Sequence, residues 1–326
     1  RELRPRKGPF KGSLFKVDVS SGRSGEQKAK TFFLGKSRKP LKPNERKIEQ
    51  VLNACFVSET KTAVRQVPHG RAGRLPIWMR ISSLRDRQYR LPVVPERYIV
   101  PLDQENIDLL HSAPAKLRRL DQEIIWSLPP IIEEDRLSWF NRTIEWLITD
   151  GFAAFQPGHF TQVGFFDPYL AAGKELHLFG HYTCNVLNSI ALRTFSENHF
   201  SGVQFSLETD EHNLDLAMRH FRSSELSSQG KGNSLTVGMY VYGRPPLFTA
   251  RLDDPRYQYG KRFVSPKNEL FTLDRGDGIT SARSVLPFSL LDQTRELENC
   301  GVNYLVVDVS AAICTSGTAR KKAENG

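Results

Sequence analysis

Apolar residues in this chain gather into short runs that recur from residue 75 onward. Eight runs have the length and composition of buried strands. Several are separated by segments with helical periodicity, and strands that alternate with helices are typical of an α/β fold with a parallel sheet. The runs cover residues 75–81, 97–102, 123–128, 152–155, 176–179, 202–207, 235–242 and 304–309.

The clearest helical pattern lies between the third and fourth runs. Leu137, Phe140, Ile144 and Leu147 form an apolar stripe, and Gly151 ends it. A further helix is predicted at residues 185–196. Another follows Asp210, which caps it, and has its apolar residues between Leu214 and Phe221. A third contains Leu290 and Leu297.

This order of elements predicts an α/β, TIM-barrel-like (β/α)8 fold over residues 75–316. The first two connections are too short for full crossover helices, so the barrel is expected to be irregular or incomplete there. A doubly wound sheet is the alternative, and it is disfavoured because no Gly-x-Gly-x-x-Gly or Walker-type loop follows a strand. Residues 248–284 form an insertion whose pattern predicts hairpins.

Charge separates the chain into two parts. Residues 1–74 contain 19 Lys or Arg and 6 Asp or Glu, whereas the remainder contains 27 and 30. A basic extension on a near-neutral body suggests a polyanion such as RNA, with Lys36, Arg38, Lys39 and Lys42 as candidate phosphate contacts. The alternative is a solvated linker. Residues 317–326 are expected to form a disordered tail.

Cysteine content and hydropathy indicate the cellular compartment in which the protein is expected. Cys55, Cys184, Cys300 and Cys314 contain no Cys-x-x-Cys pair, which argues against a disulfide framework and a structural zinc site. No apolar run approaches the roughly 20 residues that cross a bilayer. A cytoplasmic protein without a membrane partner is expected.

Polar residues that directly follow predicted strands are the candidate site, because chemistry in barrels sits at the carboxyl ends of strands. A carboxylate, a guanidinium, amides and imidazoles together could orient and protonate a polar substrate. The alternative for Arg244 is an ion pair with Glu208 or Asp308. The candidates are Glu208, Arg244, His181 and Asn185 for catalysis, with Gln156, His159 and Asp308 for substrate binding.

The segment around His181 also suggests other chemistry. His177, His181 and Cys184 could hold a metal, but Gly180 separates the two imidazoles and no metal site is expected. His181 could act as an acid or base because its ordinary pKa lies near neutrality. Cys184 could pair with His159 or His181 as a nucleophile, or could be a small buried apolar residue.

Four segments carry a family resemblance. Residues 180–189, Gly-His-Tyr-Thr-Cys-Asn-Val-Leu-Asn-Ser, resemble the Gly-Asp-Tyr-Ser-Leu-Asn-Val-x-Asn-Ser segment of the U32 collagenase-like peptidase family. Residues 204–208, 241–247 and 301–308 are similar to its Leu-Ser-x-Glu-Leu, His-Gly-Arg-x-Pro-Leu and Gly-Val-Asp-x-Leu-Arg-Ile-Asp segments, in the same order.

The resemblance implies a TIM-like barrel in a family known as peptidases, some members of which help hydroxylate transfer RNA, ribosomal RNA or quinone precursors. Those members hold an iron–sulfur cluster on four cysteines. Residues 245–299 here contain no cysteine, and His181 stands where the family has Asp. The longer members carry a second, cysteine-free barrel segment, which this chain resembles. We therefore expect no cofactor here, and a cluster-bearing U32 barrel upstream of Arg1 in the same protein.

Three functions remain open at this point. The first is a U32-type barrel that supports RNA modification. The second is a collagenase-like peptidase that hydrolyses peptide bonds. The third is a non-catalytic barrel module.

Overall fold

The computed structural model describes residues 75–88, 93–112, 123–227, 235–265, 268–276 and 279–310. Segments 1–74 and 317–326 lie outside the described residues. The expectations for the basic extension, with Lys36, Arg38, Lys39 and Lys42, and for the C-terminal tail therefore stay predictions.

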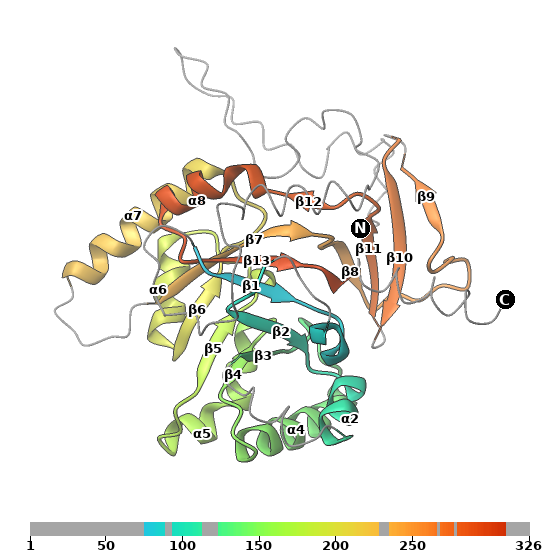
Figure 1. Ribbon diagram of the computed structural model, residues 1–326, viewed down its shortest axis with the longest axis horizontal. Helices are drawn as coiled ribbons and strands as arrows, with labels where there is room; N and C mark the ends of the chain where they lie inside the picture. The colour runs from blue at the N-terminus through green and yellow to red at the C-terminus, as the bar shows by residue number, and fades with distance from the viewer. Residues whose placement is uncertain are drawn as a thin grey trace, which may run out of the picture.

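A closed parallel barrel forms the body of the described chain (Figure 1). Consecutive strands pair side by side in parallel, and the last pairs with the first: Trp78 lies opposite Val306. The predicted TIM-like architecture is confirmed, and the ring is complete. Its strands are β1 (Ile77–Arg80), β2 (Arg97–Pro101), β3 (Ile124–Ser127), β4 (Ala154–Gln156), β5 (His177–Gly180), β6 (Phe200–Gln204), β7 (Thr236–Gly243) and β13 (Tyr304–Asp308).

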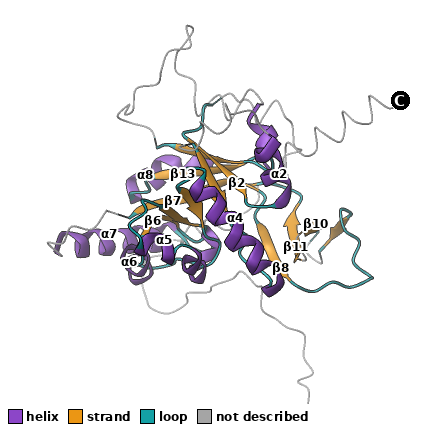
Figure 2. Cartoon of the chain, turned by 90° about the horizontal axis from the view of Figure 1, so that it is seen from below, coloured by secondary structure: helices purple, strands orange, loops and turns teal. Residues whose placement is uncertain are grey.

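The outer layer is uneven (Figure 2). In the described part of the β1–β2 connection lies a 3-10 turn, η1 (Leu84–Gln88), because the connection is too short for a crossover helix. Among the described residues, the helices are α2 (Gln104–Ser112), α4 (Leu137–Thr149), α5 (Asp167–Ala171), α6 (Ser189–Glu197), α7 (Glu211–Ser227) and α8 (Thr294–Cys300). The other 3-10 turns are η2 (Glu134–Arg136), η3 (Phe160–Phe165), η4 (Tyr182–Cys184) and η5 (Leu291–Gln293).

Most predicted elements are confirmed, with differences at some boundaries. The helix predicted from Asn185 begins at Ser189, because Asn185 takes a left-handed conformation (φ 56°) and Asn188 caps the helix by accepting from the Ala191 amide at 2.8 Å. Helix α2 was not predicted. Leu290 and Leu291 precede α8 rather than lying in it.

The insertion after β7 forms a separate antiparallel sheet. Its strands are β8 (Pro246–Ala250), β9 (Arg262–Val264), β10 (Leu270–Gly276) and β11 (Ile279–Ser284), in the order β8-β11-β10-β9. The predicted hairpin is β10 and β11. Short β12 (Phe288–Ser289) then pairs with the end of β7. Figure 1 shows this sheet beyond the carboxyl ends of β1, β7 and β13.

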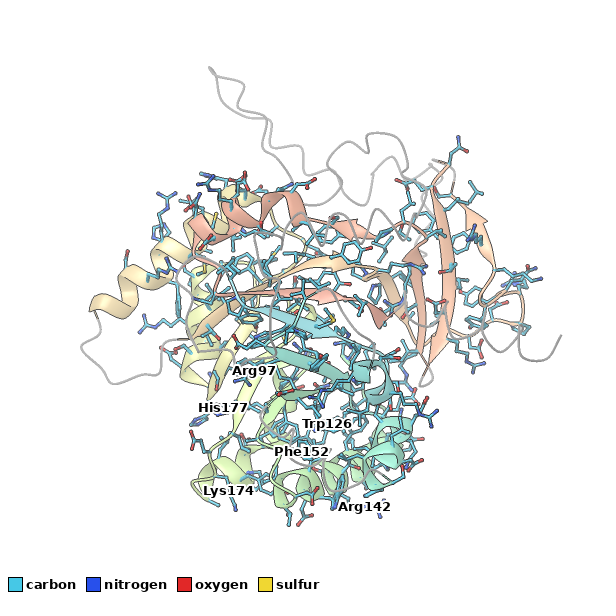
Figure 3. The ribbon with its side chains drawn as sticks, in the orientation of Figure 1. Arg97, Trp126, Arg142, Phe152, Lys174 and His177 are labelled. Carbon is cyan, nitrogen blue, oxygen red and sulfur yellow. The ribbon has the colours of Figure 1, made fainter. Side chains whose placement is uncertain are left out.

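Alternation along the strands divides the core into two layers. Outward-facing Trp126 meets the Phe152 ring edge-on, with centroids 5.7 Å apart (Figure 3). Inward-facing Trp78 stacks on Tyr304 at 3.7 Å and meets Phe179 edge-on at 4.8 Å. These three rings fill the lower part of the barrel. Among the described residues, no helix has both the length and the apolar content to cross a bilayer.

Candidate functional site

Polar side chains gather at the carboxyl end of the barrel, and we call this set the mouth cluster. Seven members come from the strands or their last turns, and Arg283 comes from the insertion. The members are Arg80, Ser127, Gln156, His181, Tyr182, Tyr240, Arg283 and Asp308.

Arg80 is held against the barrel wall by two neighbours. Its Nη1 atom donates to Ser127 Oγ at 3.0 Å and lies 3.4 Å from Gln156 Oε1. Ser127 Oγ also donates to Gln156 Oε1 at 3.0 Å. Because neutral oxygens accept these bonds, the guanidinium keeps its positive charge uncompensated by them and can attract an anion.

Asp308, the register partner of Arg80 on the neighbouring strand β13, is fully engaged. Its Oδ2 accepts from the Tyr240 hydroxyl at 3.1 Å. Its Oδ1 accepts from the Ser310 amide at 2.9 Å and the Ser310 hydroxyl at 2.6 Å. Burial, and then the Asp308 charge, raise the pKa of Tyr240 well above its usual value. Tyr240 therefore stays protonated, and Asp308 serves to position it.

The tautomer of His181 follows from its neighbours. Its Nδ1 lies 2.9 Å from Thr183 Oγ1, and that hydroxyl donates to the Gly158 carbonyl at 2.6 Å. A hydroxyl has one proton and a carbonyl has none, so the Nδ1 atom must be the donor in the His181–Thr183 bond. The Nε2 atom is left as an acceptor, and the 3.4 Å approach of the Thr183 amide to Nδ1 is not a hydrogen bond in this tautomer.

Two arginines act on this imidazole. Burial lowers the pKa of His181 well below its ordinary value, and the positive charges of Arg80 and Arg283 lower it further. His181 is therefore neutral at physiological pH. An unprotonated Nε2 in this setting can accept a hydrogen bond or a proton.

Tyr182 lies between His181 and Tyr240. Its ring centroid is 4.1 Å from that of His181 and 5.3 Å from that of Tyr240. Burial raises the pKa of Tyr182 against the opposing effect of Arg80 and Arg283, so its hydroxyl stays protonated. Its side chain is half-buried, which leaves part of the ring accessible.

The insertion supplies Arg283 to the cluster. Its Nη1 donates to the Arg244 carbonyl at 2.6 Å, and its Nε lies 3.4 Å from Asp274 Oδ2. A register shift between Ala282 and Arg283 accompanies this placement. Tertiary structure thus brings a second guanidinium to a mouth that already contains Arg80.

Below the cluster, two glutamines leave polar atoms unpaired. Gln156 and Gln204 are completely buried, and Gln204 follows the inward alternation of β6. Within the described protein atoms, Gln156 Nε2 and both polar side-chain atoms of Gln204 have no hydrogen-bond partner. Buried amides need partners, so this part of the interior suits water or polar groups of a ligand.

The predicted site residues divide into two groups. Gln156, His181 and Asp308 come together in the mouth cluster. His159 and Glu208 are exposed: His159 Nδ1 lies 2.8 Å from Thr161 Oγ1, and the Glu208 amide donates to a serine hydroxyl. They remain untested candidates outside the cluster.

Asn185 and Arg244 are held by neighbouring loops. Asn185 is exposed, and its Oδ1 accepts from Ser206 Oγ at 2.9 Å, which ties the turns after β5 and β6 together. Arg244 Nε donates to the Ser284 carbonyl at 2.7 Å, and its Nη2 donates to Thr272 Oγ1 at 3.1 Å. The hydrogen bonds of Arg244 therefore anchor the insertion.

Sequence reasoning missed five members of the mouth cluster: Arg80, Ser127, Tyr182, Tyr240 and Arg283. Arg80 ends an apolar run two residues after inward-facing Trp78, so alternation was an available signal. The same reasoning applies to Tyr240 within β7. Arg283 had no local signal, because its position depends on how the inserted sheet meets the barrel.

The described cysteines do not fit an iron–sulfur cluster or a reactive thiolate. Cys184 Sγ donates to the Pro157 carbonyl at 3.6 Å, and burial raises its pKa to about 12. Burial raises the pKa of Cys300, at the end of α8, to about 11. Both thiols stay protonated. Within the part of the chain described, no three His, Cys, Asp or Glu side chains gather as a metal site.

The fold defines an α/β protein of the irregular TIM-barrel type. No protein-family model matches the chain, and a comparison with curated proteins finds no match. Among solved structures, it is similar to the U32 peptidase Mk0906, with a TM-score of 0.43 and 11% identity over 75% of this chain and 97% of that one. It is also similar to the Bacillus cereus spore cortex-lytic enzyme SleL, with a TM-score of 0.33 and 9% identity over 82% of each chain.

Proposed function

We propose that this protein is a U32-type barrel that supports the modification of RNA and binds RNA at its mouth cluster. The observation that carries the proposal is the convergence of Arg80 and Arg283 on Tyr182 and a neutral His181. The order of the U32-like segments in the sequence supports the family assignment.

Each part of the cluster suits a different part of a nucleotide. Guanidinium groups bind phosphate oxygens through paired hydrogen bonds. A partly exposed tyrosine ring offers a surface on which an unpaired base can stack. The unpartnered amides of Gln156 and Gln204 could bind the edge of a base that enters the barrel.

The basic segment 1–74 would add contacts to the RNA backbone that do not depend on the base sequence of the RNA. Its 19 Lys or Arg against 6 Asp or Glu favour any phosphate backbone. In this proposal an iron–sulfur cluster, where the reaction needs one, belongs to a separate cysteine-bearing barrel, because the described cysteines do not fit it.

The first experiment measures RNA affinity against salt. Fluorescence anisotropy would follow a labelled single-stranded RNA with Arg80→Gln and Arg283→Gln variants at several salt concentrations. Each lost phosphate contact should lower the slope of log K against log salt by about 0.7. Arg193→Gln is the control, since Arg193 is exposed on α6 and pairs with Glu197. Unchanged slopes for both mouth variants would refute binding at the mouth.

A peptidase is the second candidate, and one observation favours it. The unprotonated Nε2 of His181 could take a proton from an attacking water. Gelatin cleavage that is lost in His181→Asn, and separately tested in Glu208→Ala, would support this function. If the protein neither binds RNA nor cleaves gelatin, the third reading, a non-catalytic module, is the better account.

A further inference from the structure

One side of the inserted sheet carries three phenylalanines, and we call it the phenylalanine face. Residues directly opposite in paired strands share a face. Phe263 on β9 lies opposite Phe271 on β10, and Phe271 lies opposite Ser284 on β11. One row further along, Phe248 on β8 lies opposite Ala282. The three rings therefore occupy one side of the four strands.

This face is open where an ordinary sheet would be covered. Phe248 is 50% exposed and Phe263 is 41% exposed. The Phe263 and Phe271 centroids are 5.7 Å apart with their planes tilted by 30°, so Phe271 supports the exposed ring. Small Ala282 and Ser284 lie on the strand between β8 and β10. The face thus has two aromatic surfaces, and the small side chains of β11 separate them.

Exposed apolar surface is concentrated on this insertion. Of the nine large apolar side chains that are strongly exposed among the described residues, six belong to residues 247–270. Isolated exposed apolar residues are normal, but a concentration of this kind marks an interaction surface. A partner is therefore expected for the insertion.

Charge indicates the class of partner. Residues 244–284 contain 8 Lys or Arg and 5 Asp or Glu, although residues 75–326 as a whole are slightly acidic. Lys261 and Arg262 are exposed immediately before Phe263, with Arg262 on the opposite face of the strand. Aromatic rings interleaved with cationic side chains are the surface that single-stranded nucleic acids bind, by stacking and by phosphate contacts.

We propose that the phenylalanine face is a second RNA-binding surface, on which unpaired bases stack against Phe248 and Phe263. The inference rests on the proposed function for its partner class. The face lies on the side of the inserted sheet opposite the mouth cluster. Thr272, which accepts from Arg244, pairs with Arg283 on one face, whereas Phe271 pairs with Ser284 on the other. The phenylalanine face is therefore a surface separate from the mouth, and an RNA strand that contacts both passes round an edge of the sheet.

A protein partner is disfavoured by how the exposed side chains divide. Phe248 and Phe263 are the strongly exposed large apolar side chains on the phenylalanine face. Val264 and Leu270 lie opposite each other on the other face of the sheet. The aromatic surface is thus separate from the aliphatic one, which suits base stacking.

The test uses the full chain and a fluorescein-labelled twelve-nucleotide oligouridylate. Affinities of Phe248→Ser, Phe263→Ser and the matched control Val264→Ser would be measured at several salt concentrations. Loss of one stacking surface should weaken binding about 5- to 100-fold for each phenylalanine variant. The slope of log K against log salt should stay unchanged, because no phosphate contact is removed. Val264→Ser, next on the same strand but on the opposite face, should bind as the parent does.

The possible results separate the two proposals. If Arg80→Gln and Arg283→Gln lower the slope while both phenylalanine variants bind normally, the phenylalanine face is refuted and the mouth site stands. If the phenylalanine variants weaken binding and the mouth variants do not, the mouth site fails instead. Equal losses in Val264→Ser and Phe263→Ser would overturn the inference, since they would indicate damage to β9 or an apolar protein-binding edge.

Discussion

The two ends of the barrel share the same strands but differ in how they are filled. Toward the amino end, the Arg97 guanidinium lies over the Trp78 and Phe179 rings at 5.5 and 5.4 Å. Trp78 also stacks on Tyr304. At the carboxyl end, the mouth cluster replaces rings with hydrogen-bonded polar groups. One end is therefore a packed plug, and the other can bind.

The packed end needs glycine to accept its rings. A Cβ atom on Gly238 would lie 2.1 Å from the Tyr304 ring, and one on Gly202 would lie 2.9 Å from Phe179. In this layer, large aromatic rings pack against glycines, so the space that a side chain would take is filled by a ring. The difference shows that the amino end of the barrel contributes mainly to stability, whereas the carboxyl end carries the groups that can bind or react, as is typical of this architecture.

The strongest test of this comparison removes a ring from the plug. Trp78→Ala should lower the free energy of unfolding by about 3–5 kcal/mol, because it leaves a cavity among packed rings. Urea denaturation would measure it. Val94→Ala is the control, since Val94 is 82% exposed and should change stability by less than about 0.5 kcal/mol. A loss below about 1 kcal/mol in Trp78→Ala would contradict the plug.

The second test titrates the mouth. The folded state holds the pKa of His181 below the ordinary 6.5, so the unfolded chain binds a proton that the folded chain does not. Stability from the neutral imidazole is therefore complete above pH 6.5 and falls as the pH drops below it, by at most about 1.4 kcal/mol per pH unit. Urea unfolding at pH 7 and 5 would show a smaller decrease in His181→Asn than in the parent. Equal decreases would contradict the lowering of the His181 pKa by burial and by the two arginines.

A matched pair of tyrosines compares the ends directly. Tyr240→Phe should cost about 1.5 kcal/mol, because it removes the hydrogen bond to Asp308. Tyr304→Phe should be neutral or stabilising, because the buried Tyr304 hydroxyl has no protein partner among the described atoms. Thermal unfolding of both variants would check the signs. A clear loss of stability in Tyr304→Phe would indicate a bound water in the plug.

The smallest stability effect is expected at Arg80. Arg80→Gln should change the free energy of unfolding by less than about 1 kcal/mol, since its bonds go to neutral groups at a partly exposed site. The same change should weaken RNA binding and lower its salt slope. A large loss of stability without an effect on binding would make Arg80 a structural residue. The carboxyl end of the barrel would then contribute to stability as the amino end does.

Much of the fold could be predicted, because the strands are short apolar runs and α4 has a clear stripe. Asp210 was predicted as a cap, and its Oδ1 accepts from the Asn213 amide at 2.7 Å. Helix α2 was missed because its pattern is weak, with Ile107 and Leu110 buried among polar residues. Local patterning determines elements well where periodicity is strong.

The site was predicted only in part, and the physical reason differs between residues. Gln156, His181 and Asp308 end or follow strands, so parallel pairing alone brings them to one end of the barrel. The sequence by itself thus determined the barrel, its polar end and three members of the mouth cluster. Tertiary structure decided the rest: Arg283 reaches His181 because the inserted sheet meets the mouth, and the phenylalanine face exists because strand register aligns residues far apart in the chain. Such placement depends on non-local pairing, which no local pattern encodes.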